Sequence, residues 1–215
     1  MGAGVRGLVM ERKCITMRRL CIWLCLLLLL LTCQAQAAER TPLKVARVPI
    51  VVASYQAPGR ETLGSLEQQV GRALHVPLNG TLHAVEFLPE REVRAAFEDA
   101  RQGPSRKWRD LVRPMAERLG ADLVVLPVLT GYEQYERMSW NWNRGTIVYS
   151  YASWELCIYD ARTDEVVRKQ ASRVFNDEYS AAGEVSVLAR TALDAVLRES
   201  GLHEKVIAGL RQQRD

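Results

Sequence analysis

The chain has 215 residues, of which 48% are hydrophobic, and it carries 29 basic against 25 acidic residues. Five of the basic residues and one of the acidic residues precede Ala38, so the remainder holds 24 of each and is formally neutral. This balance gives no electrostatic basis for nucleic-acid binding, and the roughly 178 residues from Ala38 onward are enough for one ordinary domain.

The N-terminus shows a charged, then apolar, then small-residue pattern. Arg18 and Arg19 precede an uncharged run at residues 20–32, and alanines and glutamines follow that run. This order is typical of a signal peptide, and the apolar run is shorter than the roughly 20 residues that span a bilayer. We predict a leader at residues 1–37, with cleavage after Ala37 and export to the periplasm or the exterior.

Two further interpretations concern the same leader. Because Met17 stands directly before the two arginines, residues 1–16 can be an upstream extension of the reading frame. Cys33 follows the apolar run and offers lipidation as a second route, although its preceding residue is not one that such signals usually carry. After cleavage, Cys157 is the one thiol in the predicted single domain at residues 38–215, which excludes an internal disulfide.

The first half of the mature chain alternates strands and helices. Apolar, β-branched runs predict strands, and apolar residues at helical spacing predict helices. Pro114 lies inside one of these helices and predicts a kink or a later start. The predicted elements are a strand at residues 43–53, a helix at 61–74, a strand at 82–88, a helix beginning at Pro89, a helix at 108–119 and a strand at 121–129.

A long hairpin dominates the second half. We predict that residues 130–160 form two strands joined at a turn over residues 143–145, where Gly145 can take the left-handed conformation. A strand at 165–175, a long helix with apolar residues from Val185 to Leu197 and a short helix at 202–210 follow. The pattern predicts an α/β (α+β) domain with helices packed on a mixed sheet.

Aromatic residues gather in the hairpin, with arginines among them. Such side chains can anchor a protein partner or stack on a cell-wall glycan. The other interpretation is a cross-strand ladder that only stabilises the hairpin, and a shift of one residue in register would exchange the two faces. The predicted partner-binding residues are Tyr135, Arg137, Trp140, Trp142, Arg144, Tyr149 and Tyr151.

One part of the chain resembles a known group of envelope domains. The strand ADLVVL at residues 121–126, the strand end LCIYD at 156–160 and the turn ARTDEVV at 161–167 are similar to periplasmic α/β domains related to the curli secretion protein CsgG and the amino-terminal domain of TolB. Asp164 stands where that pattern usually has Gly. The resemblance implies a non-enzymatic protein that binds or assembles an envelope component, and the single long hairpin does not favour a membrane channel.

Motifs for catalysis are absent from the sequence, and its three histidines are isolated. We therefore predict no cofactor and no metal, and an exported, non-enzymatic binding or assembly module for an envelope protein or a cell-wall component. The alternative is a periplasmic hydrolase that uses the carboxylates of Asp160, Asp177 and Glu178. A third hypothesis is a subunit that forms homo-oligomers through a sheet edge or the hairpin. Membrane contact is expected only through the leader or a lipid.

Overall fold

The computed structural model of the chain describes residues 41–77, 79, 83–138 and 146–212. Thr41–Asp215 form one compact unit, which is built on a six-stranded sheet. The predicted leader at residues 1–37, with Cys33, lies outside the described residues. Among the described helices, none combines the length and the apolar character that crossing a membrane requires.

The predicted mixed α/β class is confirmed, and the elements follow the predicted order with the first strand divided in two. The strands are β1 (Leu43–Arg47), β2 (Val51–Val52), β3 (Val85–Phe87), β4 (Leu123–Met138), β5 (Thr146–Asp160) and β6 (Glu165–Glu178). The helices are α2 (Arg60–Ala73), α4 (Glu90–Arg101), η1 (Trp108–Asp110), α5 (Val112–Leu119), η2 (Ala181–Gly183), α6 (Val185–Glu199) and α7 (Leu202–Gln212).

The sheet joins a parallel part to an antiparallel part. Its order is β3-β1-β4-β5-β6, and β2 pairs with β4 beyond the end of β1. The short strands β1, β2 and β3 make parallel pairs, whereas β4, β5 and β6 form an antiparallel meander. We call the end of the hairpin where Leu123 pairs with Asp160 its inner end. There, β4 and β5 lie in the middle of the sheet, and β6 forms one edge.

Two prolines explain why the first predicted strand is divided. Pro49 lies between β1 and β2 and has no N–H to donate to the sheet. Val125 and Leu129 in β4 accept backbone hydrogen bonds, each 2.9 Å long, from Val48 and Ala53. Pro127 lies between these two β4 residues and turns its backbone the same way, toward the gap between β1 and β2. The missing N–H groups thus fall where the parallel pairing is already interrupted.

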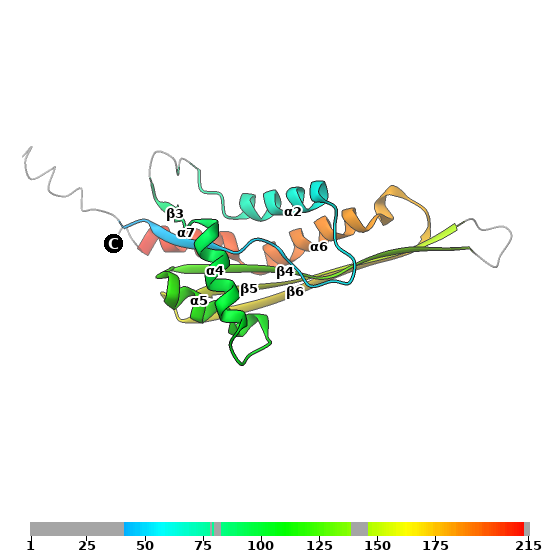
Figure 1. Cartoon of the computed structure of the whole chain (residues 1–215). Coiled ribbons are helices and arrows are strands. Elements are labelled where there is room, and N and C mark those ends of the chain that lie inside the picture. The colour runs from blue at the N-terminus through cyan, green and yellow to red at the C-terminus, as the bar shows by residue number, and fades with distance from the viewer. Residues whose placement is uncertain (1–40, 78, 80–82, 139–145, 213–215) are drawn as a thin grey trace, which may run out of the picture. The chain divides into compact units, whose positions relative to one another are not determined.

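Helices cover both faces of the sheet, as Figure 1 shows. The helices α2, α6 and α7 pack on one face, which we call the α6 face, and α4 and α5 pack on the other, the α5 face. Along β5, Trp154, Leu156 and Ile158 belong to the core on the α6 face, and Cys157 and Tyr159 belong to the core on the α5 face. The predicted alternation of this strand is confirmed.

The two helical layers cover different lengths of the hairpin. On the α6 face, Trp154 Nε1 donates a 2.9 Å hydrogen bond to the carbonyl of Ala189, and Gln134 Oε1 accepts a 2.8 Å bond from the first backbone N–H of α6. On the α5 face, the helix-covered core of β4 ends at Val128 and that of β5 at Cys157. The outer half of the hairpin therefore has α6 on one side and no helix-covered core on the other.

Candidate functional site

Three tyrosines lie on the uncovered part of the α5 face. Tyr135 of β4 stands directly opposite Tyr149 of β5, and Tyr151 follows two residues along the same strand. The rings of Tyr135 and Tyr149 stack with centroids 4.8 Å apart and an interplanar angle of 23°. Tyr135 is 51% exposed, and the other two tyrosines are partly exposed. We call this region the tyrosine surface and define it by Glu133, Tyr135, Arg137, Tyr149, Tyr151 and Val174.

A glycine makes room for the third ring. The ring of Tyr151 covers Gly131, and a Cβ at that position would overlap the ring. Gly131 follows a shift in the β4 register at Leu129. Since a residue with a side chain would displace Tyr151, Gly131 sets the position of this ring.

The same register shift decides which aromatic rings are available. Leu129 and Tyr132 both contribute to the core on the α6 face, although simple alternation would separate them. Burial raises the pKa of Tyr132. Four predicted site residues, Tyr135, Arg137, Tyr149 and Tyr151, consequently share the opposite face. Trp140, Trp142 and Arg144 lie outside the described residues.

A polar cluster adjoins the inner end of the tyrosine surface. The buried carboxylate of Glu155 accepts hydrogen bonds of 2.7 and 2.8 Å from Arg168 and one of 2.8 Å from Gln170, both on β6. The bond from Arg168 lowers the pKa of Glu155 most. Glu155 and Arg168 line a hollow of about 360 Å³ together with Lys107, Trp108 and Arg109, so its basic residues outnumber its one carboxylate. Sequence reasoning missed this cluster.

The carboxylates proposed for hydrolysis do not converge. Asp160 pairs with Glu165 at the inner end of the hairpin, whereas Asp177 pairs with Val148 near the outer end. Asp177 stands twelve residues beyond Glu165 on the same strand, which is roughly 40 Å at about 3.4 Å per residue. The prediction of a catalytic set made of Asp160, Asp177 and Glu178 is therefore wrong, because residues at opposite ends of two long paired strands cannot form one cleft.

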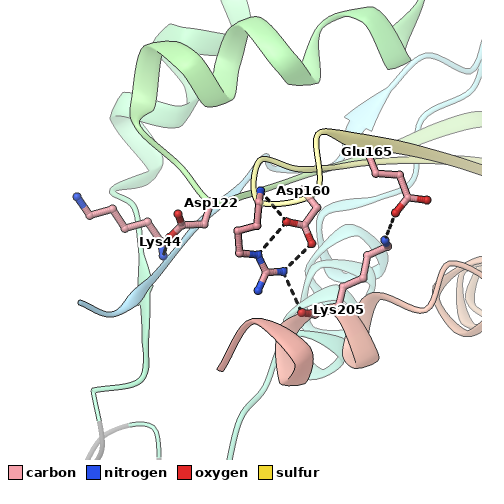
Figure 2. A network of polar contacts seen from close by, with 6 residues as sticks. Lys44, Asp122, Asp160, Glu165 and Lys205 are labelled. Carbon is pink, nitrogen blue, oxygen red and sulfur yellow. Dashed lines mark hydrogen bonds and ion pairs between the residues drawn. The ribbon is translucent and has the colours of Figure 1, made fainter. Parts of the chain in front are cut away.

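Asp160 has a structural partner instead. Its carboxylate accepts hydrogen bonds of 2.8 and 2.6 Å from the guanidinium of Arg162, which also donates a 3.2 Å bond to the carbonyl of Lys205 in α7 (Figure 2). The Lys205 ammonium forms a second link, a 2.7 Å ion pair with Glu165. Arg162 also lies directly against Gly209 of α7. This network fastens the last helix to the turn between β5 and β6.

Cys157 is an inert thiol of the core. It is fully buried on the α5 face, and burial together with the neighbouring Glu155 carboxylate raises its pKa to about 12. A thiol in this state is neutral at physiological pH and is a poor nucleophile. Among the residues that the structure describes, no group of His, Cys, Asp and Glu side chains is arranged to hold a metal ion.

A larger hollow lies between α2 and α6, away from the hairpin. It measures about 820 Å³. Arg72, Arg190 and Arg198 line it together with Asp194 and Glu204, and Arg198 forms a 3.0 Å ion pair with Asp194. Opposite charges are mixed along this groove, which gives it no marked preference for an anion or a cation.

Comparisons with known proteins assign no family to the chain. No family model matches it, and no curated protein matches it. Similar solved structures include a hypothetical protein from Chlamydia trachomatis, with a TM-score of 0.42, 16% identity and coverage of 78% of this chain and 99% of that one. A lipoprotein from Neisseria meningitidis has a TM-score of 0.37 and 15% identity over 73% of this chain and 99% of its own. The LpoB C-terminal domain from Escherichia coli has a TM-score of 0.34 and 12% identity over 63% and 85%. These likenesses are too remote to assign a family, and the resemblance to the CsgG and TolB domains stays a prediction.

Proposed function

We propose that this chain is an exported, non-enzymatic binding module of a bacterial-type cell envelope and that its tyrosine surface binds a protein partner. One observation carries the proposal. The outer part of the α5 face presents three tyrosines without a helix-covered core, and Tyr135 is half exposed although its strand is paired with β5 at that point. Tyrosine and arginine side chains supply much of the binding energy in protein interfaces.

The geometry of the rings favours a protein over a glycan. Sugars stack on the free faces of aromatic rings, but Tyr135 and Tyr149 stack on each other and Tyr151 covers Gly131. Each ring therefore has one face occupied, and its hydroxyl group and remaining surface lie beside the exposed Val174 and the basic hollow at the inner end. A mixed apolar and polar surface of this kind resembles the core and rim of a protein interface.

Export is supported by the leader pattern at residues 1–37. Cleavage after Ala37 gives a free mature N-terminus, whereas processing at Cys33 gives a lipid-attached chain. Intact mass and N-terminal sequencing of the protein isolated from an exporting bacterium distinguish the two routes. Recovery of the whole, unprocessed chain from the cytosol would contradict export.

The binding proposal is tested with a double variant of the stacked pair, Tyr135→Ser with Tyr149→Ser. The matched control is Tyr55→Ser, which removes a fully exposed tyrosine from the loop after β2. Envelope extracts are crosslinked to each purified protein, and a protein captured by the wild type and the control is then purified for affinity measurement. We expect the double variant to bind it at least about tenfold more weakly, since residues at an interface centre commonly contribute more than about 1 kcal/mol.

The simpler interpretation predicts another outcome. If the tyrosines only brace the hairpin, the double variant loses roughly 0.2–1 kcal/mol of stability for the cross-strand pair and keeps the partner's affinity. Unchanged affinity with a folded chain would therefore remove the tyrosine surface as the binding site.

A further inference from the structure

The strand β6 leaves one edge of the sheet open along its whole length. It spans 14 residues, contains no proline and pairs with β5 from end to end without a register shift. In the part of the chain that the structure describes, no segment pairs with its outer edge. A long, regular edge of this kind is a template for pairing with another chain.

Apart from Glu165, which pairs with Lys205 of α7, and the central Arg173, the charges on β6 are separated by sign. Arg168 and Lys169 lie toward its beginning, and Asp177 and Glu178 lie at its end. Between them are mostly uncharged residues, including Val174, which is 59% exposed. An antiparallel neighbour with the same sequence would bring its acidic end beside this basic end.

We propose that two copies of this chain associate edge to edge through β6, antiparallel, around a two-fold axis at Arg173. In this register Lys169 faces Asp177 of the second copy and Arg168 faces its Glu178, and both contacts occur twice. The two Arg173 residues face each other at the axis, so one like-charged pair opposes four attractive ones. Paired residues must share a face of the sheet, so the strand can slip only by two residues at a time. A slip of two in either direction removes all four ion pairs, which makes this register the favoured one.

The axis runs perpendicular to the sheet, so each face of one copy continues into the same face of the other. The two sheets would become one, and both tyrosine surfaces would point to the same side. The inference does not depend on what those surfaces bind, but a partner with repeated sites would engage both at once.

Charge reversal tests the register. The variants are Lys169→Glu, Asp177→Lys and the two combined, and Arg91→Glu on the exposed surface of α4 is the control. All are produced by export of the full chain and compared by sedimentation equilibrium over a concentration series. Each single reversal should weaken self-association by about tenfold or more, because two attractive pairs per dimer become repulsive. The double reversal should restore it, and the control should leave it unchanged.

A cysteine at the axis tests the same geometry independently. Directly opposed residues in an antiparallel pair have Cα atoms about 4.5–5.5 Å apart, within reach of a disulfide. Arg173→Cys should therefore form a covalent dimer on mild oxidation, whereas Asn176→Cys should not, since that position faces Gln170 of the second copy. A wild-type chain that remains monomeric at its solubility limit, single reversals without effect, or equal crosslinking of the two cysteine variants would overturn the proposal.

Discussion

The replacement of Asp160 by Asn separates a structural role of this carboxylate from a chemical one. The side chain of Asp160 is 5% exposed and that of its partner Arg162 is 18% exposed. Two side-chain hydrogen bonds of 2.8 and 2.6 Å and a 3.1 Å bond from the backbone of Arg162 hold the carboxylate. Asparagine keeps the shape of the residue but removes the charge, so the variant isolates the ion pair from packing.

The expected cost follows from this burial. Removing one member of a buried ion pair typically costs about 3–5 kcal/mol. Arg162 keeps its bond to the carbonyl of Lys205 and some access to water, which places the expected loss lower, at about 2–3 kcal/mol. For a domain of this size the melting temperature falls roughly 2–4 °C per kcal/mol, so we expect a decrease of about 4–12 °C.

Urea denaturation followed by circular dichroism measures this loss. The control is Asp164→Asn in the same turn, where the side chain is 65% exposed and its partner Arg113 is 48% exposed. Exposed ion pairs contribute about 0–1 kcal/mol, so the control should lie within that range of the wild type. Equal stability of Asp160→Asn and the wild type would refute the structural role of the Asp160–Arg162 pair.

Three further predictions concern the same part of the sheet. Arg168→Ala leaves the buried Glu155 carboxylate without its main partner and should lower the free energy of unfolding at neutral pH. Because Arg168 lowers the pKa of Glu155, this stabilisation is present above the ordinary carboxyl pKa and is lost as the pH falls through the lowered value. The urea midpoints of wild type and variant should therefore converge as the pH falls through the lowered pKa of Glu155, and a constant difference would contradict the ion pair. The Cys157 thiol, with its pKa near 12, should react with a thiol reagent at about pH 8 only in denaturant, and rapid labelling of the native chain would show that it is accessible. Asp164 has a φ of 53°, so Asp164→Gly should change stability by less than about 1 kcal/mol, whereas Asp164→Val should cost about 2 kcal/mol or more in the same urea assay.

The value of φ at Asp164 explains a feature that the sequence showed without its cause. The resembling envelope domains usually carry Gly at this point of the turn, and the turn requires a left-handed residue there. Asp tolerates that conformation better than most residues, and here its carboxylate also accepts a 2.9 Å bond from the Tyr159 hydroxyl. The departure from the pattern therefore preserves the turn.

Local patterns predicted the elements whose cause is local. The alternation of β5 placed Trp154 and Cys157 on opposite faces, and the helix containing Pro114 starts late, at Val112, as one of the two predicted outcomes. Pro114 falls in the first turn of α5, where its missing N–H has no helical partner to lose.

Contacts that depend on strand register were not predictable. The shift after Leu129 moves Tyr132 into the core and brings Tyr135 to the open face. Gly131 beside it is the kind of residue that often marks a bulge, but it does not by itself determine the register of the strand. The Glu155–Arg168 pair depends in the same way on the offset of β6 against β5. A single-residue error in either offset would have exchanged a surface residue for a core residue.

Element lengths explain why an open face exists at all. The strand β5 has 15 residues and is about 50 Å long, whereas α5, which covers the same face, has 8 residues and is about 12 Å long. No helix of the described chain covers the outer part of the α5 face, so this part has to be stable in water or bound to something else. Tyrosine suits both conditions, because its ring packs on the neighbouring strand and its hydroxyl group can form a hydrogen bond with water or with a partner. Lengthening α5 by two turns over the outer hairpin should therefore bury the tyrosine surface, keep the fold and abolish partner binding, and a partner that still binds such a chain with wild-type affinity must contact another face.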